Sequence, residues 1–144
     1  MKVYEFEFPA DRFYLKNHVW LKPEKGHILI GLTELGQSLS KGIVHIDLPG
    51  AGESIKKGDM LAAYETIKAV SQISLPFDAT VIEINEKLWD DPNIINNDPY
   101  KEWIVKVKGE FSDKQVLGVE EAARYYSKLI EKERQRYPDD DVFN

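Results

Sequence analysis

Residues 60–75 read MLAAYETIKAVSQISL, and this stretch decides the fold because it fits two incompatible structures. Read as a helix, it places its apolar side chains on one face. The same run also fits two strands that meet near Ile67 and Lys68, although a two-residue hairpin turn normally contains Asn-Gly or a similar pair and none is present. Local patterns therefore leave open whether Lys68 is an ordinary exposed helix residue or the tip of a hairpin. The apolar positions at helical spacing are Met60, Ala63, Tyr64, Ile67 and Val70.

The segments around this stretch favour a chain of short strands separated by turns. Thr33 is placed to cap a short helix that runs through Ser40, with Gly42 beyond its end. Residues 49–59 and 87–100 are rich in Gly, Pro, Asp and Asn, which is typical of loops. Four runs have the composition or the alternation of β-strands: HILIGL (27–32), IVHIDL (43–48), TVIEIN (80–85) and WIVKVK (103–108).

The two ends of the chain differ from this central part. Residues 1–16 are rich in aromatic side chains and alternate in VYEFEF, which predicts an edge strand or an arm packed on the surface. Near the other end, Ser112 to Gln115 has the pattern of a capping box. We expect a helix from about Val119 to Tyr137, followed by a solvated acidic tail.

Composition limits the function classes. The 144 residues carry a net charge of −6 and contain no cysteine, which argues against a general nucleic-acid binder and excludes disulfides and thiolate chemistry. No apolar run approaches the roughly 20 residues that cross a bilayer, and we expect a cytoplasmic protein. The three histidines, His18, His27 and His45, show no metal-ligand spacing. An enzyme in its own right is therefore not the expected class.

Four segments, taken in order, resemble one known family, the H protein of the glycine cleavage system, which carries lipoate. The resemblance runs from about Tyr14 to Val107, and the C-terminal helix also has a counterpart in that family. The resembling segments are HVWLKPEKGHILIGLTELGQ (18–37), IVHIDLPGAGESIKKGD (43–59), ETIKAVSQISLPFDATVIEIN (65–85) and DDPNIINNDPYKEW (90–103).

The resemblance implies a mainly β fold: a flattened β barrel or sandwich of the lipoyl/biotinyl-carrier type, with a short internal helix and a C-terminal helix. It implies one domain over 1–144, with the barrel at about 14–109, a helical extension at about 112–137 and the tail at 138–144. Residues Met60–Thr66 and Ala69–Leu75 then become strands.

The resemblance also identifies the site of lipoate attachment. Lys68 would stand at the hairpin tip and carry lipoate through an amide bond, with Glu65, Thr66, Ile67 and Ala69 around it. We expect Glu65 and Ile67 to contribute to the surface that the attaching enzyme reads, although Glu65 fits a plain solvated strand position equally well.

If the resemblance extends to the pathway, the chain is a non-catalytic carrier that shuttles the aminomethyl intermediate of glycine on this lipoyl group. The implied partners are a pyridoxal-phosphate glycine decarboxylase, a folate-dependent aminomethyltransferase, dihydrolipoamide dehydrogenase and a lipoate-attaching enzyme. Neither nucleic acid nor a membrane is among the expected partners.

Some positions depart from the family pattern. The usual His-Glu-Trp reads His18-Val19-Trp20 here, and Leu39 stands where the family commonly has a histidine. In family members, the acid and the histidine at these positions help to hold the lipoyl arm when it carries a protonated amine. Valine in place of the acid removes the attraction between the carboxylate and that amine. A lipoate carrier for another process, such as sulfur-compound oxidation beside a heterodisulfide-reductase-like complex, is therefore an alternative, as is an unmodified interaction module. A biotin carrier would normally have Met-Lys-Met around Lys68, which this chain lacks.

Overall fold

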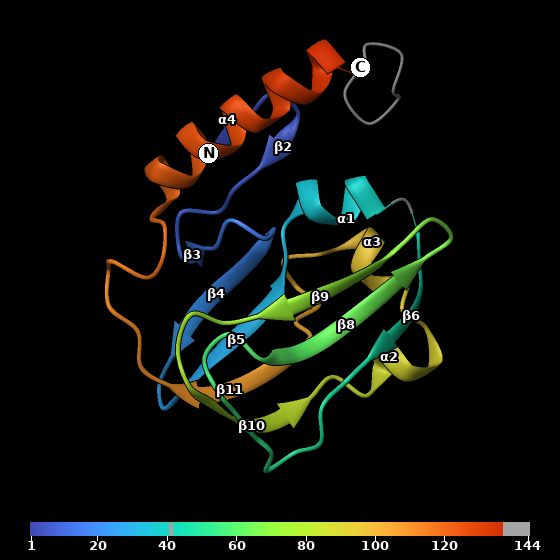
Figure 1. Ribbon diagram of the computed structural model, residues 1–144, viewed down its shortest axis with the longest axis vertical. Coiled ribbons are helices and arrows are strands. Elements are labelled where there is room, and N and C mark those ends of the chain that lie inside the picture. The colour runs from blue at the N-terminus through green and yellow to red at the C-terminus, as the bar shows by residue number, and fades with distance from the viewer. Residues whose placement is uncertain (41, 137–144) are drawn as a thin grey trace.

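The computed structural model describes residues 1–40 and 42–136. Its central part is a stack of two antiparallel sheets, which Figure 1 shows facing each other. The larger sheet has six strands in the order β3-β4-β5-β11-β10-β7 and the smaller has three in the order β6-β8-β9. The strands of the larger sheet are Phe13–Tyr14 (β3), Val19–Glu24 (β4), His27–Leu32 (β5), Val105–Gly109 (β11), Ala79–Ile84 (β10) and Ser54–Ile55 (β7); those of the smaller are Ile43–Asp47 (β6), Met60–Thr66 (β8) and Val70–Ser74 (β9).

The expected mainly β architecture is confirmed, in the form of a sandwich whose sheets do not close into a barrel. The main apolar core lies between the two sheets and includes Leu21 and Ile30 from the larger sheet and Leu61 and Ile73 from the smaller. This is the arrangement in which facing sheets bury alternate side chains of each strand. The strand interpretation of residues 60–75 is therefore correct, and the helix interpretation is wrong.

A second apolar cluster joins both ends of the chain to the larger sheet. The helix α4 (Val119–Arg136) packs against a small hairpin made of β1 (Lys2–Val3) and β2 (Phe6–Glu7), as Figure 1 shows. The expected arm at the N-terminus is thus a two-stranded hairpin whose Phe6 is buried beneath the helix. The expected helix start at Val119 is confirmed, and Tyr137 and the tail at 138–144 lie outside the described residues.

The internal helix α1 (Glu34–Ser40) begins where the sequence predicts. Gly36 N donates a hydrogen bond of 3.0 Å to Thr33 Oγ1, which is the expected N-cap. In contrast, residues 87–100 are not a plain loop, because they contain the short helices α2 (Lys87–Asp90) and α3 (Ile94–Asn97). Their buried side chains Leu88 and Ile95 explain why this polar segment forms helical turns against the core.

Two further predictions need correction. Ser112 N donates to Gln115 Oε1 as a capping box requires, yet residues 112–115 form a turn and no helix follows until Val119. In β6 the expected alternation is broken by a register shift opposite β8, so that Ile43 and Ile46 are buried while Val44 is exposed. A β-bulge of this kind adds one residue to one strand and reverses the alternation.

No helix among residues 1–40 and 42–136 is long and apolar enough to cross a bilayer.

Candidate functional site

The hairpin tip lies within the three residues, 67–69, that join β8 to β9. Strand β8 ends at Thr66, and the backbone N–H of Thr66 donates a hydrogen bond of 2.9 Å to the carbonyl of Ala69. The preceding ladder pair is Glu65 with Val70. Ile67 and Lys68 therefore occupy the two central positions of a tight reversal.

The side chain of Thr66 explains how this turn forms without Asn-Gly. Its Oγ1 accepts hydrogen bonds from the backbone N–H groups of Lys68 and Ala69 at 3.3 and 3.2 Å, and lies 3.3 Å from the Ala69 carbonyl, to which it donates. The non-glycine residues with positive φ in the described part of the chain are Tyr4 and His18, so neither tip residue adopts the left-handed conformation that Asn-Gly turns use. A hydroxyl that bonds the following backbone groups replaces that turn chemistry.

The five residues predicted for the site lie together at this tip. Ile67 is 90% exposed, and Glu65, Lys68 and Ala69 are also exposed. Within the described residues, the Lys68 ammonium group forms neither a hydrogen bond nor an ion pair with another side chain. The arrangement presents a free primary amine on a hairpin whose stem is anchored in the sheet, so an enzyme can reach the amine without unfolding the chain.

Exposed apolar side chains lie beside this amine on the hairpin and on the neighbouring strand β6, and strand alternation does not predict them. In the ladder, His45 of β6 lies opposite Glu65, which lies opposite Val70 of β9. Val70 is 66% exposed and Val44, in the bulge beside His45, is 55% exposed. Because clustered apolar side chains on a surface mark interaction sites, we identify Val44, Ile67 and Val70 as the tip surface.

A small pocket lies between α1 and α4, on the side of the molecule where the hairpin tip lies. The pairing of Ile43 with Thr66 brings the end of α1, a few residues earlier in the chain, close to the tip. The pocket has a volume of about 250 Å³, and Glu133 of α4 is its one charged lining residue. Its lining is His18, Leu35, Leu39, Leu129, Ile130 and Glu133.

His18 in this pocket is neutral in the physiological range. Burial lowers its pKa to about 4, and its Nδ1 is buried with no hydrogen-bond partner among the described residues. Val19 is fully buried beside it and Leu39 is only about one-third exposed. The two positions at which the sequence departs from the family pattern are thus both apolar here, and neither supplies a charge.

No group of three or more His, Cys, Asp or Glu side chains with metal-binding geometry occurs in residues 1–40 and 42–136.

Comparison with known proteins gives a consistent result. A family profile for the glycine cleavage H-protein matches residues 12–133. The chain is 35% identical over 133 residues to a probable glycine cleavage system H protein from Thermococcus gammatolerans, covering 90% of this chain and 99% of the relative. It is 38% identical over 121 residues to a glycine cleavage system H protein from Thermoanaerobacter pseudethanolicus, covering 84% and 94% of the two chains. The fold is similar to the crystal structure of a glycine cleavage system H protein from Mycobacterium marinum, with a TM-score of 0.74 and 27% identity over 85% of this chain and 98% of that one.

Proposed function

The chain belongs to the glycine cleavage H-protein family, and from that membership we propose that it is a non-catalytic carrier that holds a lipoyl group on Lys68. The single observation that supports this most is the exposed ammonium group at the tip of the β8–β9 hairpin, which has no partner among residues 1–40 and 42–136. An amide bond between lipoate and Lys68 Nζ removes the positive charge of the lysine. Because this ammonium group has no ion-pair partner among the described residues, no existing interaction would be lost on attachment.

The chain's own residues suit this role. Thr66 fixes the direction in which the tip leaves the sheet, and the ladder between β8 and β9 anchors its base. Glu65 and Ile67 lie on either side of Thr66 and project into solvent, where an attaching enzyme can read them. Lipoate supplies a disulfide that accepts the aminomethyl unit of glycine. The rigid sandwich keeps the arm's attachment point fixed, and tethering raises the local concentration of the arm at each partner's active site.

The partners that follow from this proposal are those that load, unload and reoxidise the arm, together with the enzyme that attaches it. They are glycine decarboxylase with its pyridoxal phosphate, the folate-dependent aminomethyltransferase, dihydrolipoamide dehydrogenase and a lipoate ligase or transferase. The tip surface of Val44, Ile67 and Val70 is the part of the chain that each of these enzymes meets as it receives the arm. A cytoplasmic location belongs to this proposal as well.

Intact mass after incubation with lipoate, ATP and a lipoate ligase tests the attachment. We expect the gain of one lipoyl group in the parent chain and no gain in Lys68→Arg, which keeps the charge but cannot form the amide. Lys57→Arg is the matched control, because it changes another exposed lysine and leaves the tip intact. An unmodified parent chain would favour the interaction module over the carrier.

The apolar pocket favours a second candidate, a lipoate carrier for another process. The family's amine-holding acid is replaced by the buried Val19, and Glu133 is the one carboxylate that lines the pocket. If the glycine pathway is correct, a protonated amine on the arm needs this carboxylate, because an ion pair is the strongest hydrogen-bonded contact available to it.

Glycine-dependent loading of the lipoylated chain by a competent decarboxylase separates the two candidates. The glycine role predicts loading by the parent chain and a clear loss of loaded product in Glu133→Gln. Absence of loading in the parent chain, with complete lipoylation shown by mass, would favour the other process.

A further inference from the structure

Strand β9 (Val70–Ser74) leaves one edge of the smaller sheet open, as Figure 1 shows. Within the described residues, it is the last strand of that sheet and pairs with β8 alone. Its sequence, VSQIS, contains neither a charged residue nor a proline. Natural proteins often protect an edge strand with such residues, because an unprotected edge is a template for another strand. The edge of β9 lacks this protection.

The hydrogen bonds of the hairpin determine which backbone groups this edge offers. Thr66 N is bonded to Ala69 O, and the antiparallel ladder continues with Glu65 opposite Val70. Because the direction of the backbone groups alternates along a strand, the N–H and C=O groups of Val70 and Gln72 point away from β8. Val70 is 66% exposed and Gln72 is also exposed, so this part of the edge is accessible.

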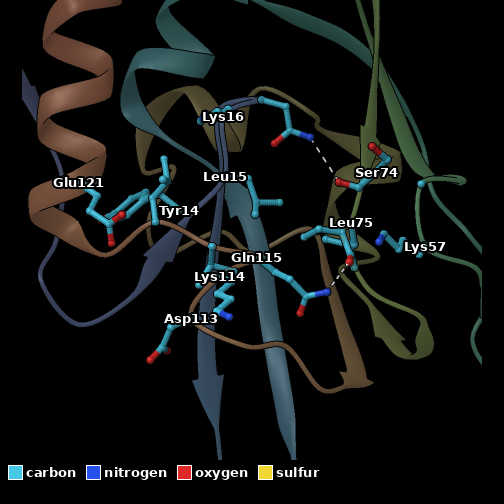
Figure 2. A pocket seen from close by; sticks show the side chains of 15 residues that line it. Tyr14, Leu15, Lys16, Lys57, Ser74, Leu75, Asp113, Lys114, Gln115 and Glu121 are labelled. Carbon is cyan, nitrogen blue, oxygen red and sulfur yellow. Dashed lines mark hydrogen bonds between the residues drawn. The ribbon is translucent and has the colours of Figure 1, made fainter.

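The chain itself closes the edge beyond Gln72. Asn17 Nδ2 donates a hydrogen bond of 3.3 Å to the carbonyl of Ser74, and Figure 2 shows this bond as the dashed line that ends at Ser74. At its other end, the strand begins directly after the turn at Ala69. The free edge is therefore limited to residues 70–72.

A strand with this pattern of free groups can pair with itself. If two copies meet antiparallel about a two-fold axis at Ser71, Val70 of each copy lies opposite Gln72 of the other. Both are residues whose backbone groups point outward, so each pair exchanges N–H and C=O as a hydrogen-bonded ladder pair does. The two pairs give four main-chain hydrogen bonds, which use both residues of the free edge on both copies.

The side chains of this edge also favour a second copy over an unrelated segment. An uncharged strand that meets itself places no like charges opposite each other, and such charges are what destabilise cross-strand pairs. Residues 70–74 offer neither an acidic nor a basic segment a charge of the opposite sign. A longer peptide gains little, because the carbonyl of Ser74 is already bonded to Asn17.

We propose that this chain forms a two-fold symmetric dimer in which β9 of one copy pairs antiparallel with β9 of the other. The two three-stranded sheets then form one sheet of six strands, in the order β6-β8-β9-β9-β8-β6. Such an interface is isologous, because the same residues of both copies make the contact. Its area is small compared with that of an obligate dimer, so the dimer dissociates on dilution.

The dimer goes beyond the carrier role, and its formation needs neither Lys68 nor lipoate. It does affect the surface beside that lysine, because Val70 belongs both to the paired edge and to the tip surface. A second copy and an enzyme that meets the tip surface therefore cannot use Val70 at the same time. Pairing would keep the carrier apart from its enzymes at high concentration, and this consequence alone rests on the proposed function.

Sedimentation velocity of the full, unmodified chain over roughly a hundredfold range of concentration tests the association. We expect a monomer at the lowest concentration and a growing dimer fraction above it. In ¹⁵N-labelled protein, amide exchange at Val70 and Gln72 should slow as the concentration rises, because their N–H groups become bonded in the dimer. Exchange at Ser71, whose N–H already points towards β8, should depend much less on concentration.

Two double variants test the register of the pairing. V70K/Q72K and V70E/Q72E each place like charges opposite each other, and each is expected to weaken association roughly tenfold or more. The lysine variant adds two positive charges to a chain of net charge −6, so general repulsion between copies cannot explain its loss. An equal mixture of the two variants should form a mixed dimer, since every lysine then faces a glutamate. Val44→Lys, which alters an exposed valine on the opposite edge strand β6, should leave association within about twofold.

The proposal is overturned by a monomer at every concentration, by association that the charged variants do not weaken, or by a mixture that forms no more dimer than its components. Circular dichroism checks that every variant is folded. If a charged pair prevents folding, Gln72→Pro replaces it, because proline removes one outward N–H and is tolerated at a strand edge. Lys68→Arg should dimerise like the parent chain, so that failure of lipoylation and failure of dimerisation are distinguished.

Discussion

At the scale of single residues, the hydroxyl of Thr66 closes the hairpin turn that carries Lys68. Its hydroxyl takes the place of the Asn-Gly pair that a two-residue turn usually needs. The segment Glu65-Thr66-Ile67-Lys68-Ala69 was identified from its resemblance to a family, because nothing in local turn statistics points to Thr as the residue that closes a hairpin. The only feature of the sequence that indicates this turn is the hydroxyl of Thr66, two residues before Lys68.

Removing this hydroxyl tests its role. Thr66→Val keeps the branched shape and removes the hydrogen bonds to the Lys68 and Ala69 amides, so we expect a loss of about 1 kcal/mol in the free energy of unfolding. Amide exchange at Lys68 and Ala69 should accelerate, as measured by NMR. Thr66→Ser keeps the hydroxyl and should retain the protection. Unchanged exchange in Thr66→Val would mean that the backbone alone holds the turn.

His18 gives the chain a specific pH dependence. Burial lowers its pKa from 6.5 to about 4 in the folded chain, whereas the unfolded chain takes up the proton near pH 6.5. The His18 contribution to the free energy of unfolding is therefore unchanged above pH 6.5. It then falls as the pH drops towards 4, by at most about 3 kcal/mol.

The variant His18→Asn isolates this contribution, because Asn tolerates the positive φ of 69° at this position. Urea midpoints at pH 7 and pH 4.5 should differ less in the variant than in the parent chain. The same pH difference in both proteins would assign the acid sensitivity to carboxylates and not to His18.

At the scale of elements, the sequence predicts strands well where one face is buried and less well where the ladder is irregular. Strand β5 coincides with HILIGL at 27–32, because β4 pairs with its whole length and β11 pairs with its residues 28–30. The bulge that exposes Val44 in β6 is invisible to an alternation rule, since one inserted residue reverses the pattern midway. The helical turns in residues 87–100 are not predicted, because few apolar side chains, Leu88, Ile94 and Ile95, pack them against the core.

The pairing of β4 with β5 depends on a glycine opposite a tryptophan. Trp20 is paired with Gly31, and its Nε1 donates to the Pro99 carbonyl at 3.0 Å, which fixes the ring. A Cβ at Gly31 would lie 2.7 Å from that nitrogen and closer still to the ring carbons. The side chain cannot move aside without breaking the bond to Pro99.

Gly31→Ala should therefore destabilise the chain by about 3 kcal/mol, at the upper end of the usual cost of overpacking. Urea denaturation followed by tryptophan fluorescence measures this loss. Gly50→Ala is the matched control, because its new Cβ would meet nothing closer than 3.6 Å and should change stability by less than about 0.5 kcal/mol. Equal effects at the two glycines would rule out the ring contact as the cause.

At the scale of the whole molecule, the tip and the C-terminal helix belong to different apolar clusters. The hairpin stem packs in the core between the sheets, whereas α4 packs with β1, β2 and α1 around Phe8, Trp20 and Tyr126. The OH group of Tyr126 donates to the Leu15 carbonyl and accepts from His18 N, so the helix is fixed to the segment that leads into β4. We propose that these clusters still form one folding unit over 1–144, as expected from the sequence.

Truncation after Leu117 tests this unit. Without α4, the aromatic side chains of the second cluster become exposed, and we expect a lower urea midpoint together with binding of the dye ANS. Lipoylation of Lys68 in any folded fraction should persist, because no tip residue belongs to that cluster. An unchanged midpoint would instead show that the sheets fold independently of the helix.

The hydroxyl-closed turn has one more consequence, for the lifetime of the protein. Asparagine and glutamine are thermolabile residues that proteins of hot environments use sparingly, and an Asn-Gly turn would place an asparagine directly beside the attachment lysine. Thr66, Ile67 and Lys68 include neither asparagine nor glutamine, so no residue of the turn can deamidate. The tip is therefore protected against this form of chemical ageing during prolonged incubation at high temperature.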